Sequence, residues 1–199
     1  MAKYTGYVTI PHATYYQWKN ATNGNGYDFD PLAGYGCQCY DLAVEFWWNV
    51  GFPAGYPIIT NSSAYTMWDN RVANCSYNGV TYFDLVTRAT DIKKGDVVVF
   101  TFSQANPYGH VGFADTDYDS WQRDPNEPYE FPVLSQNNGG TPDPVGGAYT
   151  NVHGYDIRLF LGAFRYKGWE LTPPTPTPTT VKRSKFPFVL YARKLRGGR

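Results

Sequence analysis

The stretch CYDLAVEFWWNV, residues 39–50, decides the predicted fold. Leu42, Phe46 and Val50 recur at every fourth position and form one apolar stripe, which is the spacing of an amphipathic helix. A glycine follows directly, and glycine commonly ends helices. The stretch therefore predicts a helix that starts at Cys39 and packs one face against a core.

Two further helices are predicted near this one, and strands follow them along the chain. Residues 13–20 and 62–73 have helical character, whereas the later apolar runs are rich in β-branched and aromatic residues. Four such runs are separated by turn residues: GDVVVFTF at 95–102, HVGFAD at 110–115, EFPVLSQN at 130–137 and RLFLGAFRY at 158–166. Helices followed by sequential strands predict an α+β fold in which helices pack on an antiparallel sheet.

Proline and threonine alternate in LTPPTPTPTT, residues 171–180, and this composition predicts an extended linker. The linker separates a globular domain, 1–170, from a short tail, 181–199. All 17 acidic residues precede the tail, which itself has seven basic residues and no acid. Such a cationic, partly apolar tail predicts binding to an anionic polymer or an anionic membrane, or else packing against the acidic domain or a role in assembly.

The cysteine content and the N-terminal residues bear on the cellular compartment. Cys37 and Cys39 are separated by one residue, a spacing that strains a disulfide, and no second close cysteine pair favours a metal site. The start, MAKYTGYVTIPHA, has no apolar signal-peptide segment, and no apolar run approaches the roughly 18 residues of a membrane span. Synthesis in a cytoplasm that keeps thiols reduced is therefore expected.

Cys39 and His110 are the predicted reactive pair. A cysteine at a helix start lies near unpaired N–H groups, which favour a thiolate and can hold an oxyanion. His110, in PYGHVGF, starts a predicted strand and can act as the base of that thiol. His12 and His153, the latter in the loop GAYTNVHGYD, have the character of surface residues. A buried, purely structural cysteine is the alternative.

A third polar group is needed to orient the imidazole of the base. The strand that ends in VLSQNN offers four candidates, Ser135, Gln136, Asn137 and Asn138. A simple turn at SQNNGG is the alternative interpretation of the same residues.

Three aspartates, Asp28, Asp30 and Asp41, flank the predicted nucleophile. Hard oxygen ligands at alternate positions of a loop suit Ca²⁺. The segment lacks the glycine and glutamate positions of an EF-hand loop, and ordinary Asx turns with an acid at a helix start account equally well for the three residues.

Taken together, these motifs resemble the CHAP family, the cysteine- and histidine-dependent amidohydrolases/peptidases of phage lysins and bacterial wall-remodelling enzymes. The resemblance covers roughly residues 10–166, and its motifs are YYQWKNATNGNGYDFDPLAGYGCQCYDLA, GDVVVF, GHVGF and LSQNN. It implies a papain-like fold with Cys39 as nucleophile, His110 as general base and Asn137 as the third polar residue.

The same resemblance implies two supporting sets of residues. Gln38, directly before the nucleophile, would help to form the oxyanion hole, and Cys37 would be a packing residue. In calcium-binding members the ligands of a structural Ca²⁺ match Asp28, Asp30 and Asp41.

The chain departs from the family pattern beside the third polar residue. Ser135 stands where many members have an acid. Asn137 would then act alone, or Glu127 or Glu130 from the preceding long segment would fold back to assist it.

The resemblance also implies the reaction and the biological setting. The expected activity is hydrolysis of a peptidoglycan amide bond, either as an N-acetylmuramoyl–L-alanine amidase or as an endopeptidase. The setting would be a phage endolysin made in the host cytoplasm and acting on the cell wall, or a lysin carried on a phage tail. A catalytically silent wall-binding or virion structural module, and a protease or transpeptidase with a protein substrate, are the alternatives. Nucleic acid is not an expected partner.

Overall fold

The computed structural model describes residues 3–4, 14–28, 36–53, 63–137 and 149–169. The predicted linker and tail lie outside these ranges, as do His12, Asp30 and Asn138. Within the described residues, no helix has the length and apolar character needed to cross a membrane.

The central helix has the predicted bounds, and its neighbours differ from their predicted ones. Thr14 caps the first helix by accepting a 3.2 Å hydrogen bond from the Gln17 N–H, so this helix starts and ends two residues later than predicted. The helix predicted over 62–73 is wrong as a single unit, because the Asn70 side chain bonds the Thr66 carbonyl at 3.1 Å and the helical path breaks there. The helices are α1 (Tyr15–Thr22), α2 (Cys39–Val50), α3 (Thr66–Asp69) and α4 (Arg71–Asn74), with 3₁₀ turns η1 (Ala89–Asp91), η2 (Tyr118–Ser120) and η3 (Ile157–Leu159).

Within the described residues, six strands form an antiparallel sheet in the order β5-β10-β6-β7-β8-β9. Four of these strands were predicted, with slightly wider bounds, whereas β5 and β9 were not. Their bounds are β5 (Phe83–Val86), β6 (Val97–Phe100), β7 (His110–Ala114), β8 (Glu130–Ser135), β9 (Asn151–Asp156) and β10 (Phe160–Tyr166). Two small pairs accompany the sheet, the parallel β1 (Lys3–Tyr4) with β2 (Gly26–Tyr27) and the hairpin β3 (Ser76–Tyr77) with β4 (Val80–Thr81). The predicted α+β fold with an antiparallel sheet is confirmed.

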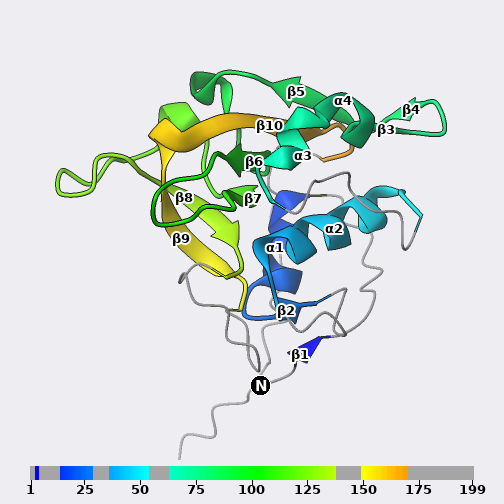
Figure 1. Ribbon diagram of the computed structural model, residues 1–199, viewed down its shortest axis with the longest axis horizontal. Helices are drawn as coiled ribbons and strands as arrows, with labels where there is room; N and C mark the ends of the chain where they lie inside the picture. Colours follow the sequence, from blue (N-terminus) through cyan, green and yellow to red (C-terminus); the bar gives the residue numbers. More distant parts are fainter. Residues whose placement is uncertain (1–2, 5–13, 29–35, 54–62, 138–148, 170–199) are drawn as a thin grey trace, which may run out of the picture.

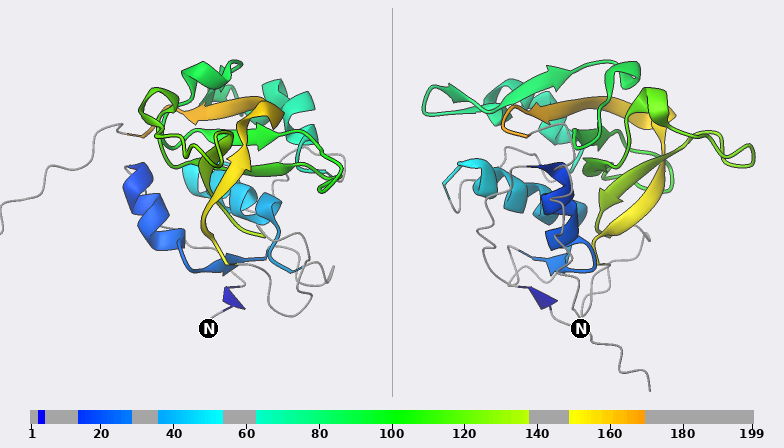
Figure 2. Two further views of the ribbon diagram at one scale, coloured as in Figure 1. Left: turned by 90° about the vertical axis from the view of Figure 1, so that its left-hand side faces the viewer. Right: turned by 180° about the vertical axis from the view of Figure 1, so that it is seen from behind.

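The long helices α1 and α2 lie on one side of the sheet (Figures 1 and 2). Trp18 of α1 and Phe46 of α2 pack against Phe113 of β7, with ring centroids 5.4 and 5.1 Å from that of Phe113. A second cluster of buried residues covers the opposite face of the sheet and includes Phe100 and Phe131. In Figure 1, β9 runs at a steep angle to β10, from which three strands separate it in the sheet, so the sheet is strongly twisted between β10 and β9.

Two ion pairs join separate elements of the fold, one between α1 and the end of β7 and the other between β10 and the start of β6. Lys19 of α1 contacts the Asp115 carboxylate at the end of β7 at 2.7 Å. On β6's side, the Arg165 guanidinium donates two hydrogen bonds, of 2.9 and 2.7 Å, to Asp96, a carboxylate with only 2% exposure. Bidentate pairing of this kind satisfies a buried carboxylate that would otherwise be costly.

Candidate active site

Cys39 is the first residue of α2, a helix that packs against β7. Desolvation raises the pKa of the Cys39 thiol to about 11, although nearby backbone amides at the helix start and at Val111 of β7 act in the opposite direction. The helix-start amides therefore favour a thiolate as expected, and burial opposes them.

His110 is the first residue of β7 and is buried, with 1% exposure. Gly109 precedes it with a φ of 66°, and a Cβ there would lie 2.6 Å from the Phe100 carbonyl, so only glycine suits this turn. The strand that starts at His110 packs against α2, the helix that starts at Cys39. The two predicted reactive residues thus lie on elements that pack against each other.

A hydrogen bond of 2.8 Å joins His110 Nε2 to Ser135 Oγ. Ser135 is fully buried on β8 and stands where the family resemblance implied an acid. Glu127 and Glu130, considered as substitutes for that acid, are exposed. In the tautomer whose Nε2–H donates to this hydroxyl, Nδ1 is the ring nitrogen that can accept a proton.

Asn137 lies beside Gln38. The Asn137 side-chain amide donates a 2.7 Å hydrogen bond to Gln38 Oε1, and Asn137 has a φ of 59°, in the left-handed region. The Gln38 backbone N–H donates to the Asp41 carboxylate at 2.7 Å, an N-terminal cap of α2. The structure thus places Ser135 at the base and Asn137 at the residue predicted for the oxyanion hole; the catalytic roles of both stay predictions.

Gln136 joins three separate parts of the chain. Its amide donates to the carbonyls of Tyr27 at 2.7 Å and Gln38 at 2.6 Å, and its oxygen accepts from the Tyr27 N–H at 3.1 Å. The side chain has no exposed surface. Sequence reasoning placed Gln136 only among candidates for the third group. Gln136 comes two positions after Leu134, so both side chains point to the helix side of the sheet. This spacing is the sequence signal for the position of Gln136.

The CHAP domain family model matches residues 22–121, half of the chain. This chain belongs to the CHAP domain family. A curated relative, the D-alanyl-L-alanine endopeptidase of Streptococcus phage B30, is 32% identical over 160 residues, which cover 79% of this chain and 31% of the relative. The chain therefore spans about a third of that protein's length.

A solved structure shares the fold of this CHAP domain. The wild-type endolysin LysIME-EF1 aligns with a TM-score of 0.53 and 22% sequence identity. The alignment covers 80% of this chain and 66% of the endolysin chain.

Two of the three predicted calcium ligands of this CHAP domain are described. Asp28 is buried, and its Oδ1 has no hydrogen-bond partner, as expected of an oxygen that awaits a cation or water. Asp41 is also buried and caps α2 through Oδ2, whereas Asp30 lies outside the described residues. Among the described residues no three His, Cys, Asp or Glu side chains are grouped for a metal, so the calcium site stays a prediction.

The sequence did not predict the strand that carries His153 and Tyr155. Residues 151–156 form the edge strand β9, so the loop predicted around His153 is wrong, although His153 is exposed as expected. Polar side chains on this strand hid its alternation. Tyr155 stacks on the His110 ring with centroids 3.9 Å apart, and no motif in the sequence pointed to it.

Proposed function

We propose that this CHAP domain is a peptidoglycan hydrolase that cleaves an amide bond of the bacterial cell wall, with Cys39 as nucleophile and His110 as base. The observation that carries the proposal is the packing of α2, which starts at Cys39, against β7, which starts at His110. The phage B30 relative, an endopeptidase, supports the same class of reaction.

The proposed reaction is a two-step acyl transfer. His110 Nδ1 takes the thiol proton as the Cys39 sulfur attacks the amide carbonyl, because the resting thiol is neutral. The tetrahedral intermediate then expels the amine, which receives the proton from His110. Water attacks the resulting thioester with His110 again as base, and this step releases the carboxylic acid and restores the thiol.

Gln38 is proposed to stabilise the oxyanion of the intermediate. Its side-chain oxygen is held by the Asn137 amide, so its NH₂ group lies at the other end of the planar amide. A donor fixed before the reaction stabilises developing charge without having to reorganise. The same contact gives Asn137 its proposed role.

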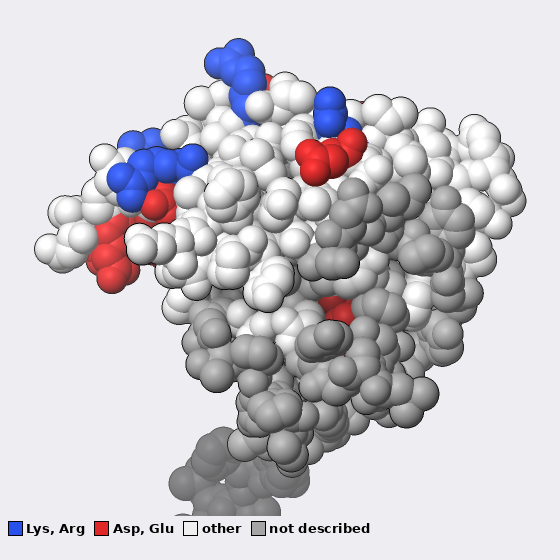
Figure 3. Space-filling view, viewed as in Figure 1, with Lys and Arg blue, Asp and Glu red and all other residues white. Residues whose placement is uncertain are grey.

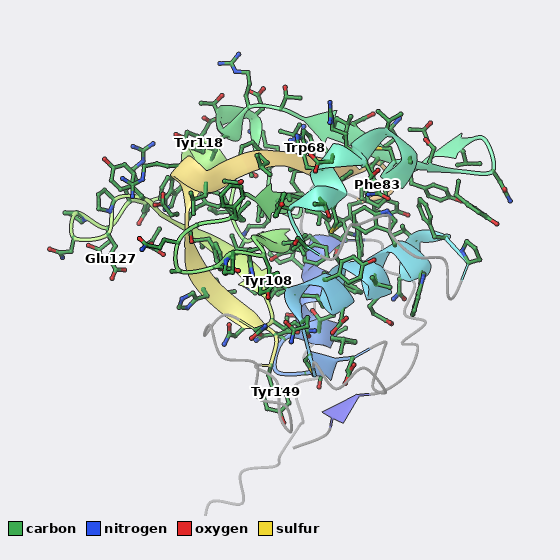
Figure 4. The ribbon with its side chains drawn as sticks, viewed as in Figure 1. Trp68, Phe83, Tyr108, Tyr118, Glu127 and Tyr149 are labelled. Carbon is green, nitrogen blue, oxygen red and sulfur yellow. The ribbon has the colours of Figure 1, made fainter. Side chains whose placement is uncertain are left out.

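The surface beside His110 suits a substrate with uncharged groups. Phe102 and Tyr108 belong to the loop before His110 and are 57% and 65% exposed. Figure 4 shows the labelled Tyr108 toward the centre of the view. In Figure 3, charged side chains gather on the upper and left parts of this face, and its centre is mostly uncharged among the described residues. Aromatic side chains can pack on sugar and peptide groups there.

The test is hydrolysis of purified walls by the full chain. Wild type should clear a peptidoglycan suspension, whereas Cys39→Ala and His110→Ala should bind walls and lose clearing. His153→Ala, which changes an exposed histidine on β9, is the matched control and should clear like wild type. Wall binding by wild type without any clearing would instead identify a catalytically silent module.

Mass spectrometry of the released fragments identifies the bond that is cut. A free N-acetylmuramic acid carboxyl with a new L-alanine amine indicates an amidase, and a new amine within the peptide indicates an endopeptidase. Intact wall fragments together with cleavage of a protein substrate would contradict the proposal.

A structural Ca²⁺ held by Asp28, Asp30 and Asp41 is proposed with this function. When bound, the ion would fix the loop before Cys39 and take no part in the acyl transfer. The orphaned Oδ1 of Asp28 supports this assignment.

The basic tail, 181–199, is proposed to attach the enzyme to anionic teichoic acids or an anionic membrane. Deletion of 172–199 should abolish binding to intact walls and spare hydrolysis of soluble muropeptide. Unchanged wall binding of the shortened chain would overturn this proposal. The setting proposed for the whole is a phage lysin, acting from the host cytoplasm or carried on a phage tail.

A further inference from the structure

The Tyr155 ring lies flat on the His110 imidazole. The two ring centroids are 3.9 Å apart and the planes differ by 10°. Tyr155 comes from the edge strand β9, two strands away from β7 in the sheet. Along the chain, β9 leads through η3 to Phe160 of β10. Phe160 pairs with Phe100 of β6, and Phe100 pairs in turn with His110 of β7. The twist of the sheet therefore brings an edge residue over the predicted base.

The hydroxyl end of Tyr155 lies near Asn106, in the loop that precedes His110. The Asn106 amide donates to the Gly109 carbonyl at 2.8 Å, and its oxygen accepts from the Tyr108 N–H at 3.1 Å. Tyr155 therefore contacts the imidazole and lies near the loop that carries it.

The hydroxyl of Tyr155 stays neutral in this position. Desolvation raises its pKa well above the ordinary value, and the nearby ionisable groups of Cys39 and Glu130 act in the same direction. A neutral phenol adds no charge to the site, so its effect on His110 is one of contact and shielding.

A hydroxyl and a flat ring restrain the imidazole in different ways. The bond from Ser135 Oγ fixes the position of Nε2, yet a hydroxyl oxygen accepts over a broad range of directions and leaves the ring plane poorly defined. A face-to-face contact fixes that plane. The terminal torsion of histidine is a broad, soft rotation, so this restraint acts where the side chain is otherwise loosest.

We propose that Tyr155 is a positioning residue for the base, which sets the plane of the His110 ring and thereby aims Nδ1 at Cys39. The proposal rests on the proposed function for its catalytic consequence. It assigns to Tyr155 a restraint on the ring plane, beside the hydrogen bond that Ser135 makes with Nε2.

The test compares variants of Tyr155 in the full chain. Tyr155→Leu removes the flat ring and should lower kcat on soluble muropeptide about a hundredfold, the cost of a misplacement of about 1 Å, with KM within about twofold. Tyr155→Phe keeps the ring and should recover kcat to within about fivefold of wild type. Tyr118→Leu removes another tyrosine that packs on the same face of the sheet and should leave kcat unchanged.

Nuclear magnetic resonance of the His110 ring nitrogens supplies a readout independent of turnover. Wild type should give one sharp Nε2–H tautomer, and Tyr155→Leu should give broadened, averaged ring signals. If the leucine variant fails to fold, Tyr155→Ile, which suits a strand, replaces it with the same expectation.

Two results would overturn the proposal: a folded Tyr155→Leu protein with wild-type kcat, or one with wild-type ring signals. Failure of the proposed function looks different. Wild type would then leave peptidoglycan uncut while the ring signals still respond to the loss of the tyrosine.

Discussion

The Asn137 amide and the Gln38 side-chain oxygen are joined by a 2.7 Å hydrogen bond across 99 positions of the sequence. The family resemblance implied that Asn137 is the polar partner of the base. In the structure Ser135 contacts the base, and Asn137 contacts Gln38, the predicted oxyanion donor.

Asn137→Ala should lower kcat about tenfold to a hundredfold with little change in KM, because the Gln38 donor loses its fixed orientation. Steady-state kinetics on soluble muropeptide measures both constants, with Asn126→Ala, an exposed loop change, as control. A normal kcat in Asn137→Ala, combined with a low one in Gln38→Ala, would remove Asn137 from this role.

Ser135→Ala should lower kcat about tenfold to a hundredfold, because the buried Nε2 of His110 loses the partner that fixes its tautomer. The ring-nitrogen signals of His110 should shift at the same time. Ser120→Ala, at an exposed serine in η2, should change neither quantity. Retained activity with an altered tautomer would show that the hydrogen bond is dispensable.

Alkylation of Cys39 by iodoacetamide should accelerate about tenfold for each pH unit between pH 7 and 10, because only the thiolate reacts and the thiol has a pKa of about 11. Peptide mapping by mass spectrometry, with EDTA present, follows Cys39 separately from Cys37 and Cys75. A rate that levels off near neutral pH would mean that a thiolate already exists in the resting protein.

Arg165→Met should reduce the free energy of unfolding by about 2–4 kcal/mol, because it leaves the Asp96 carboxylate buried without its partner. The partial exposure of Arg165 places the effect below that of a fully buried pair. Urea unfolding measures the change. Arg158→Met breaks the exposed pair with Asp156 and should lower the stability much less than Arg165→Met does. Equal losses in the two variants would show that burial of Asp96 has no special effect.

Millimolar Ca²⁺ should raise the melting temperature of wild type relative to EDTA, since a ligand that binds only the folded state stabilises it. Asp28→Asn should remove most of that increase, and Asp124→Asn, at an exposed position, should keep it. Identical melting curves of wild type with Ca²⁺ and with EDTA would rule out the ion.

Strong periodicity made α2 and the strands β6, β7, β8 and β10 predictable, because their buried faces leave a regular apolar pattern. Other elements depend on contacts that a single sequence does not reveal. Edge strand β9 has an exposed, polar first half, and Asn70 divides a helix that composition alone made continuous.

The site was predictable to the same degree. The sequence motifs predicted Cys39 and His110, which are the first residues of two elements that pack together, α2 and β7. The stacking of Tyr155 and the bonds of Gln136 arise from the twist of the sheet and from distant pairings, for which the local sequence contains no signal.

The bonds of Gln136 also bear on the order in which the chain folds. They connect residues 98 and 109 positions apart, and such long loops close late because their entropy cost precedes any gain. The sheet and helices can therefore form before the Gln136 amide makes its hydrogen bonds. In such a state the residues of the site are close together but not yet aligned. Mild denaturants should therefore abolish turnover at concentrations that leave the secondary structure intact, so the assembly of the site is the last and least cooperative step of maturation.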